Sequence, residues 1–286
     1  MAVVWPEQII DSLARRRAVI VIGSGVSANA RTEAGVAPPI WSSFLKEAYT
    51  RLGRRVSHIQ RALTRYDYLA ACDYLKTEHG AGWAPLLRAS FAAPRYLPAE
   101  IHETIFNLDS RIVASLNFDK IYETYAIAAS DGTVVVKNYY DQDIRQVLAG
   151  SGRYIIKPHG DIDTVPQLIF THSEYTAARV NHANFYEMMG ALLHTHTFIM
   201  IGCGLSDPDI QIMFEDYLHK FQESAHFMTY SPKMSEAEIS LVERTRGIHL
   251  LPYSSKNDHD ELKMSLKHLV ELVGERRQTL ATDFNW

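Results

Sequence analysis

An α/β fold, with a parallel sheet and helices on both of its faces, is predicted by two features of this 286-residue sequence. Short apolar and β-branched runs, typical of buried strands, alternate with longer segments whose apolar residues recur at helical spacing. The first run, residues 18–22, breaks abruptly into glycines and small hydroxyl residues, as a buried strand does before a tight turn into a helix. Such alternation favours a Rossmann-like sheet, in which ligands bind beyond the carboxyl ends of the strands.

The first third of the chain is predicted to be mainly helical. A short helix over residues 6–16 leads into the strand at 18–22, and a loop at 35–40 follows the glycine turn. Ser42 or Ser43 can cap the next helix, which runs to about residue 52. The apolar residues then keep helical spacing without a convincing strand, and a further helix is predicted within 94–107. We therefore expect a single domain over 1–286 with a helical insertion at about 42–108.

The remainder of the chain returns to alternating strands and helices. Strands are predicted at 111–116, 133–136, 154–156, 167–170, 197–201, 225–229 and 248–251. Helices are predicted after the strand at 111–116 through residue 129, from Ser173 to about 194, and over 235–246 and 260–272. Asp207 followed by Pro208 has the form of a helix N-cap with a first-turn proline.

Composition limits the class of protein. Hydrophobic residues make up 47% and charged residues 22% of the chain, which is ordinary for a globular protein with a sizeable core. The formal net charge of -4 gives no support to nucleic-acid or membrane binding through bulk electrostatics. The sequence contains no run of 18 apolar residues and no signal-peptide pattern, so we expect a cytoplasmic protein without a membrane span.

Metal binding is not expected from the residues present. Cys72 and Cys203 are the two cysteines, so this chain alone cannot form a four-cysteine zinc site, and a disulfide framework is disfavoured. His194 and His196 are two residues apart and would lie on different faces of a helix. We therefore interpret this pair as a helix end and loop rather than as metal ligands.

Four groups of small or polar residues follow runs that have the character of buried strands. Gly23 and Gly25 can bring backbone N–H groups close to a pyrophosphate at the start of a helix. The other groups are Asn117 with Asp119, residues 157–161 around His159, and residues 202–207. In a parallel sheet all four converge on one edge, and this convergence is a stronger signal than any single motif.

Each group also has a purely structural interpretation. Asn117 can satisfy backbone groups at a strand end, and Asp119 can cap the following helix. His159 can be a turn residue or a core histidine, and Asp207 is better explained as a helix cap than as a catalyst. Tyrosine-rich patches, including the one at residues 66–68, are interpreted as packing rather than as a base-stacking platform.

The glycine turn alone is a weak signal. Gly23, Gly25 and Ala28 fit the spacing of a dinucleotide fingerprint. The acidic residue that usually ends a second strand about 20 positions later is missing, because Glu47 lies inside a helical pattern. A redox dehydrogenase is therefore disfavoured.

Five ordered blocks resemble the sirtuin superfamily, and most closely the sirtuin-like domains of bacterial antiphage defence systems. The blocks are Gly23-Ser-Gly-Val-Ser27, Leu116-Asn-Phe-Asp119, Lys157-Pro-His-Gly160, Ile201-Gly-Cys-Gly-Leu-Ser206 and Gly247-Ile-His-Leu-Leu-Pro-Tyr253. The zinc-binding cysteines of sirtuin deacylases are absent, and Ala37-Pro-Pro-Ile-Trp41 replaces their proline-aspartate-phenylalanine-arginine element. Both departures disfavour removal of acyl groups from lysine.

The resemblance implies an NAD hydrolase that cleaves the nicotinamide–ribose bond to give nicotinamide and ADP-ribose, with NAD as substrate. Asn117 would position water and ribose, His159 would act as general base, and Asp119 or Asp161 would steady the site electrostatically. Trp41 would form a wall over the nicotinamide. The other expected NAD-binding residues are Gly23, Ser24, Gly25, Val26 and Ser27 at the pyrophosphate and Gly202, Cys203, Gly204 and Ser206 on the adenosine side.

Two alternatives stay open at this point. One is an NAD- or nucleotide-binding regulatory module without turnover, and the other is ADP-ribosyl transfer or cyclisation. Because unchecked loss of NAD would kill the host, the resemblance also implies control by homo-oligomerisation and by a partner protein. A HerA-like ATPase is the first expected partner and an Argonaute-type protein the second.

Overall fold

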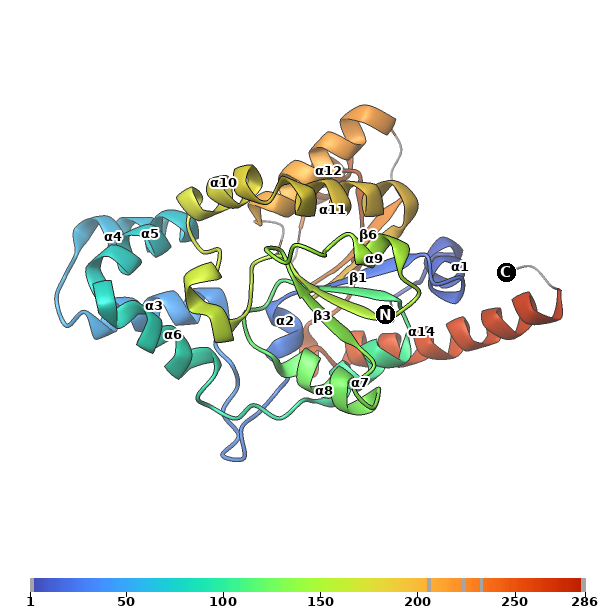
Figure 1. The fold of residues 1–286 in the computed structure, drawn as a ribbon, viewed down its shortest axis with the longest axis horizontal. Helices are drawn as coiled ribbons and strands as arrows, with labels where there is room; N and C mark the ends of the chain where they lie inside the picture. Colours follow the sequence, from blue (N-terminus) through green and yellow to red (C-terminus); the bar gives the residue numbers. More distant parts are fainter. Residues whose placement is uncertain (1–2, 205–206, 223–224, 232–233, 284–286) are drawn as a thin grey trace.

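The protein is described by a computed structural model that covers residues 3–204, 207–222, 225–231 and 234–283. At its centre is a seven-stranded sheet with the order β3-β4-β2-β1-β5-β6-β7 (Figure 1). The strands are β1 Ala18–Ile22, β2 Ile112–Ser115, β3 Val135–Asn138, β4 Tyr154–Lys157, β5 Thr197–Ile201, β6 His226–Tyr230 and β7 Ile248–Pro252. All neighbouring strands are parallel, so the predicted Rossmann-like α/β sheet is confirmed.

Helices cover both faces of the sheet (Figure 1). Along β1, Ala18, Ile20 and Ile22 point into one core, whereas Val19 and Val21 point into the other. The first core is closed by α1 Glu7–Ala14, α7 Glu100–Asn107, α8 Ile121–Ala129 and α14 Lys256–Thr282. The second is closed by α9 Gln146–Ala149, α10 His172–Asn181, α11 Ala183–Thr195, α12 Pro208–Phe221 and α13 Glu236–Arg246.

Four helices within the range predicted as a helical insertion share a core of their own, and we call this group the insertion. It consists of α3 Trp41–Arg51, α4 Ser57–Thr64, α5 Tyr68–His79, the short turn Gly80–Gly82 and α6 Trp83–Phe91. Phe44, Ile59 and Leu87 pack there with Phe118 and Phe170, which come from the sheet side. Helix α7, which lies inside the predicted bounds of 42–108, packs on the sheet through Ile101 and Ile105 rather than on these helices.

Several predicted elements differ in the structure. Helix α3 begins at Trp41 with Ile40 at its N-cap, so neither Ser42 nor Ser43 caps it. The strand predicted at 167–170 is wrong: Gln167 ends the 3-10 turn Ile162–Gln167, and residues 168–170 belong to no strand of the described sheet. Leu168, Ile169 and Phe170 are nevertheless buried, which explains the strand-like apolar run. The long helix predicted from Ser173 is two helices, capped at the start by Thr171 and interrupted at His182, whose backbone is not helical.

Buried His226 makes stability depend on pH. Its ring lies in β6 among the rings of Phe198, Phe214 and Tyr217, and its Nδ1 accepts a hydrogen bond from the Phe198 backbone N–H at 3.2 Å. Burial lowers the pKa of His226 from 6.5 to about 4, because a charged ring would lose its hydration there. The folded protein therefore holds His226 neutral in a range where the unfolded chain takes up a proton.

We expect the free energy of unfolding to fall by about 3 kcal/mol, through this group, as the pH drops from 6.5 to about 4. The sign follows from the lowered pKa, since the unfolded state binds the proton first. Urea denaturation across this range measures the effect, and His226→Gln, which cannot titrate, is the control. An equal loss of stability in both proteins would exclude His226 as the source.

Candidate functional site

A cavity of about 940 Å³ lies beyond the carboxyl ends of the central strands. This volume is in the range of small-molecule sites, and the position beside β1 is where the order of the strands reverses. The predicted residues that line it are Gly23, Ser24, Gly25, Val26, Trp41, Asn117, His159, Gly202, Cys203 and Gly204. Ser27 and Asp119 are not among the described lining residues, and Ser206 lies outside the described part of the chain.

The glycine turn and the turn after β5 form one packed unit. The turn enters α2 Ser24–Ser27 directly from β1, and the Gly25 N–H donates to the Gly202 carbonyl at 3.0 Å. A Cβ on Gly23 would lie 2.4 Å from that same oxygen, so a side chain cannot fit between the two turns. Gly202 itself has φ +63°, which favours glycine. The glycines thus let the two backbones approach at the floor of the cavity.

Asn117, which follows β2, forms hydrogen bonds with the glycine turn of this unit. Its buried Nδ2 donates to the Gly23 carbonyl at 3.0 Å and to Ser27 Oγ at 2.9 Å. Both amide hydrogens are therefore used within the protein, which leaves Oδ1 to accept a hydrogen bond from a ligand or water. Asn117 Oδ1 is thus free to accept a hydrogen bond from water, as predicted. The predicted donation from Nδ2 to a ribose hydroxyl would require breaking its hydrogen bond to Gly23 or to Ser27.

His159 is buried just after β4 and faces a carboxylate. Its Nε2 lies 3.3 Å from Asp207 Oδ2 and 3.4 Å from the hydroxyl of Tyr175, which donates to the same carboxylate at 3.1 Å. A carboxylate at Nε2 holds the ring proton on that nitrogen, so Nδ1 is the basic atom of the neutral ring. The arrangement suits a general base whose tautomer is fixed.

Asp207 has two roles in the structure. Its Oδ1 accepts from the backbone N–H of Ile210 at 3.0 Å, so the predicted cap of α12 is confirmed. Its other oxygen holds His159, a contact that the sequence interpretation did not include. Asp207 followed by Pro208 predicts a helix cap and nothing more. The contact between the start of α12 and the end of β4 depends on the tertiary fold, which this pattern does not give.

A second carboxylate, that of buried Asp209, lies near the same ring at a greater distance. Its Oδ2 lies 4.0 Å from His159 Nε2 and accepts from the Tyr186 hydroxyl at 2.9 Å. Arg179 holds its other oxygen at 2.7 Å. Burial raises the pKa of Asp209, although His159 and Arg179 both act to lower it. Tyr175, Arg179, Tyr186 and Asp209 were all missing from the predicted site.

Asp119 lies beside the cavity floor. Its Oδ1 accepts from the Ile121 N–H at 3.1 Å, and its carbonyl accepts from the Nζ of Lys157 at 2.8 Å. Lys157 is fully buried and forms an ion pair with buried Glu123. Asp119 is not the cap of α8, since Lys120 occupies the N-cap position, but its side chain binds the first N–H of that helix. The catalytic role of Asp119 stays a prediction. Asp161 similarly accepts from the Asp163 N–H at the start of a 3-10 turn.

Trp41 stands at the edge of the insertion where it meets the cavity. Its ring packs edge-on against Phe118 and Phe170, with centroid distances of 5.7 and 5.2 Å. The ring is therefore fixed by neighbours on the sheet side. Its predicted place over a nicotinamide ring stays a prediction.

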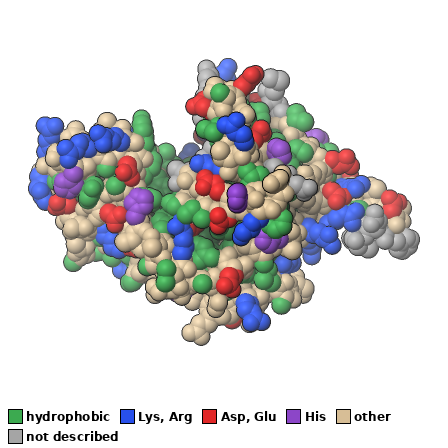
Figure 2. Space-filling model, turned by 90° about the horizontal axis from the view of Figure 1, so that it is seen from above, with side chains coloured by type: hydrophobic (Ala, Val, Ile, Leu, Met, Phe, Trp, Pro, Cys, Tyr) green, Lys and Arg blue, Asp and Glu red, His purple; other side chains and the backbone are tan. Residues whose placement is uncertain are grey.

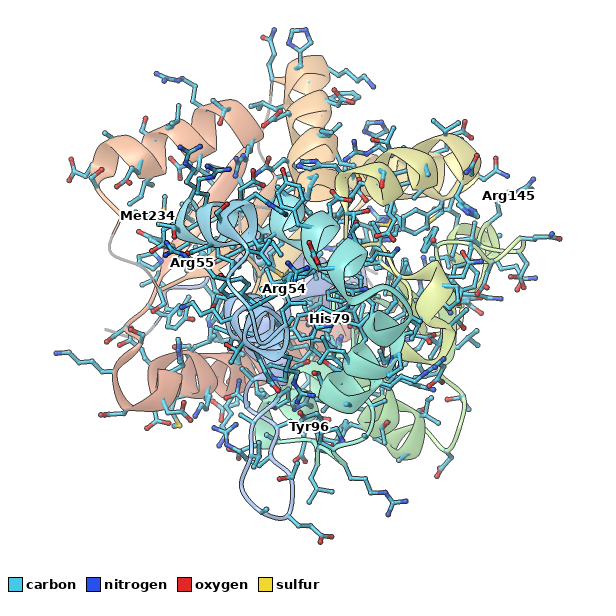
Figure 3. The ribbon with its side chains drawn as sticks, turned by 90° about the vertical axis from the view of Figure 1, so that its left-hand side faces the viewer. Arg54, Arg55, His79, Tyr96, Arg145 and Met234 are labelled. Atoms are coloured by element: carbon cyan, nitrogen blue, oxygen red, sulfur yellow. The ribbon has the colours of Figure 1, made fainter. Side chains whose placement is uncertain are left out.

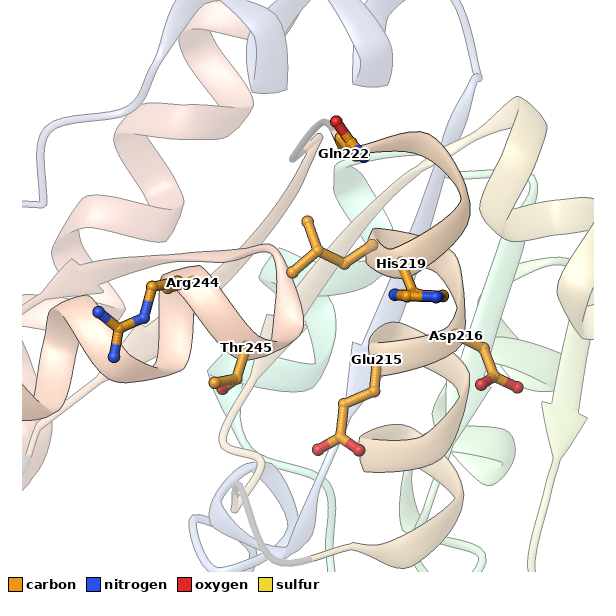
Figure 4. A pocket seen from close by; sticks show the side chains of 7 residues that line it. Glu215, Asp216, His219, Gln222, Arg244 and Thr245 are labelled. Carbon is orange, nitrogen blue, oxygen red and sulfur yellow. The ribbon is translucent and has the colours of Figure 1, made fainter.

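A second hollow, of about 830 Å³, lies beside α12 and α13 (Figure 4). Its described lining includes Glu215, His219, Gln222 and Arg244, and none of the predicted site residues. Within the described ranges, no cluster of three or more His, Cys, Asp or Glu is placed to hold a metal ion. None of the helices in the described part of the chain is long and apolar enough to cross a membrane.

The sheet order and a glycine-floored cavity lined by Asn117 and His159 define a Rossmann-like protein with a site at the reversal of strand order. In a comparison with known families, the model of the SIR2-like domain matches residues 111–251, just under half of the chain. The resemblance to sirtuins is thereby confirmed for the part of the chain that contains Asn117 and His159. The glycine turn after β1 precedes the matched range.

Three curated bacterial proteins are similar to the chain. "Defense-associated sirtuin 2" of Bacillus subtilis is 24% identical over 168 residues, covering 56% of this chain and 16% of that protein. "NAD(+) hydrolase ThsA" of Enterococcus faecium is 23% identical over 210 residues, covering 72% and 41%. The ThsA of Acinetobacter baumannii (strain 532279) is 21% identical over 145 residues, covering 50% and 30%. The match thus spans less than half the length of each relative.

Proposed function

We propose that this protein is an NAD hydrolase that cleaves the nicotinamide–ribose bond, releases nicotinamide and ADP-ribose, and depletes NAD during antiphage defence. The observation that carries the proposal is that Asn117 and His159, whose ring faces the carboxylate of Asp207, line the same glycine-floored cavity. The names of the similar proteins, which are an NAD hydrolase and a defence-associated sirtuin, support the same reaction and setting.

The chemistry needs a base and a positioned water. Nicotinamide leaves NAD as a neutral molecule, because the electrons of the breaking C–N bond neutralise its positively charged ring nitrogen. No acid is therefore required for departure, unlike the hydrolysis of ordinary glycosides. The water oxygen bonds to the anomeric carbon of the oxocarbenium-like ribose, and its proton passes to Nδ1 of His159.

The rest of the cavity would hold the dinucleotide. Asn117 Oδ1 would accept from the attacking water or from a ribose hydroxyl and so fix its position. The turn at Gly23 to Ser27 would lie against the pyrophosphate, with Cys203 and Gly204 toward the adenosine. Ser27 would act indirectly, since its hydroxyl accepts the hydrogen bond from Asn117.

Asp207→Asn is expected to lower nicotinamide release by about 10²–10⁴-fold without unfolding the protein. Asparagine is also a good N-cap, so α12 keeps its start, but the amide no longer fixes the proton on Nε2 of His159. Steady-state release of nicotinamide measures the effect, and a thermal melt checks the fold. Asp216→Asn, an exposed change on the same helix, is the matched control. Activity of Asp207→Asn within twofold of the wild type would remove Asp207 from the mechanism.

Product analysis separates the proposed reaction from its alternatives. Incubation of the protein with NAD, followed by mass spectrometry, should give nicotinamide and linear ADP-ribose in equal amounts. Cyclic ADP-ribose or a protein heavier by one ADP-ribosyl group would instead indicate cyclisation or transfer. Calorimetric binding of NAD without release of nicotinamide would favour a regulatory module. The last two results would each overturn hydrolysis by the chain under those conditions.

We also propose, from the family resemblance, that the chain acts in the cytoplasm as a homo-oligomer controlled by a second protein. A HerA-like ATPase is the first candidate partner and an Argonaute-type protein the second. Mass photometry of the purified chain, alone and mixed with each candidate, tests this directly. A monomer that forms no complex with either candidate would contradict it.

A further inference from the structure

The helical insertion carries a cluster of arginines that the proposed NAD site does not use. Between residues 51 and 65 the sequence has five arginines and no acidic residue, although the chain has a formal net charge of -4. The cluster, called the arginine patch, consists of Arg51, Arg54, Arg55, Arg61 and Arg65, all with exposed side chains. Lys and Arg side chains gather over this end of the molecule, at the left of Figure 2.

The charge of the arginine patch is only partly neutralised. Arg51 pairs with Glu47, and Arg54 pairs with Glu78. The Nε of Arg55 donates to the uncharged amide of Gln60 at 3.1 Å. In the part of the chain that the structure describes, Arg61 and Arg65 form no ion pair. The insertion therefore presents a positive surface on a chain that is negative overall.

The free arginines lie in a row with exposed aromatic rings. His58 and Arg61 lie in α4 and Arg65 is its C-cap residue; their i, i+3 and i+7 spacing places them along one face over about 10 Å. On the neighbouring α5, the ring of Tyr74 packs edge-on against His58 at a centroid distance of 4.6 Å and is 40% exposed.

The row continues to the mouth of the large cavity. Tyr66, which directly follows Arg65, is 77% exposed and lines the cavity together with Tyr68. Figure 3 faces this end of the molecule, with Arg54 and Arg55 near the centre of the view and Arg145 at its edge. A ligand lying along the row would therefore end at the rim of the site.

Guanidinium groups beside exposed aromatic rings match the chemistry of a single nucleic-acid strand. Phosphates pair with the arginines, and unpaired bases stack on the rings. An acidic polypeptide would satisfy the arginines but offers no flat bases for Tyr66 and Tyr74. We propose that the arginine patch binds single-stranded nucleic acid along α4, leading toward the cavity rim. This binding does not depend on the proposed NAD hydrolysis.

Fluorescence anisotropy of a labelled 20-nucleotide oligothymidylate with the full chain tests the proposal. Affinity should fall with rising salt, and Arg61→Gln/Arg65→Gln should bind more weakly, with a log–log salt slope shallower by about 1.4, or about 0.7 per lost phosphate contact. Arg145→Gln/Arg244→Gln removes two exposed arginines elsewhere and should leave affinity and slope unchanged. Thermal melts should be the same for all of these proteins, because every substituted side chain is exposed.

A change at Tyr74 separates stacking from charge. Tyr74→Ser should weaken binding by about 5–100-fold and leave the salt slope unchanged, because a stacked base is lost and no phosphate contact is removed. Absence of binding at low salt, or an equal loss in the control double variant, would overturn the proposal. Displacement by polyglutamate as effectively as by unlabelled oligonucleotide, at equal charge, would show that the patch is a site for acidic polypeptides.

Discussion

His159→Ala is expected to lower the rate of nicotinamide release by about 10²–10⁴-fold while leaving NAD affinity within a few-fold of the wild type. The reason is that the ring supplies the basic nitrogen, with its proton fixed on Nε2 by Asp207 at 3.3 Å. The glycine turns and Asn117, which would hold the dinucleotide, do not contact the ring through any described hydrogen bond.

Nicotinamide release and NAD calorimetry, measured on the same preparations, check this expectation. His268→Ala removes an exposed histidine on α14 and should behave as the wild type. Loss of binding and of turnover in equal measure would assign His159 to substrate binding. Full turnover by His159→Ala would show that the base lies elsewhere.

Asn117→Ala is expected to lower nicotinamide release by at least about 10²-fold and also to reduce stability by about 1–3 kcal/mol. The substitution removes the acceptor that positions water or ribose, and it leaves the Gly23 carbonyl and the Ser27 hydroxyl without their buried donor. The two effects are separable, because loss of positioning acts on turnover and loss of the hydrogen bonds acts on unfolding.

Nicotinamide release together with urea denaturation measures both effects. Asn117→Asp keeps the shape of the side chain but places a carboxylate against the Gly23 carbonyl, so it should also be inactive. Asn181→Ala, at the exposed end of α10, is the matched control. A stable and fully active Asn117→Ala protein would exclude both roles of this side chain.

Much of the sheet could be predicted because a buried parallel strand needs an apolar run with definite ends. β1 has the predicted bounds, since all five of its residues are buried between two helical layers. The same reasoning failed at residues 167–170, where Leu168 and Phe170 are buried against the insertion without a neighbouring strand. A short apolar run predicts that its residues are buried. Whether it pairs with a neighbouring strand depends on the tertiary fold.

The site was predictable to the extent that its residues follow strand ends. Parallel strands place Asn117, His159 and the turn at Gly202 on one edge, so their shared cavity follows from the topology. Tyr175 and Asp209 come from helices whose placement the sequence pattern does not give. The contact of Asp207 with His159 was missed for the same reason.

The net charge of the whole chain does not reveal the local cluster of arginines. The formal net charge of -4 disfavours nucleic-acid binding when it is taken over the whole chain. The run of arginines from 51 to 65 becomes a surface only when α4 and α5 are placed side by side. Local charge on a folded surface can thus support a ligand that the total charge does not.

Release of nicotinamide from NAD in a single turnover, with enzyme in excess over substrate, is the sharpest test of NAD cleavage by His159 and Asn117. We expect release by the wild-type chain, alone or with the proposed partner, and loss of release in His159→Ala and Asn117→Ala at NAD concentrations where binding of the dinucleotide is measured to be complete. Intact NAD under every condition, or full release by both variants, would contradict it.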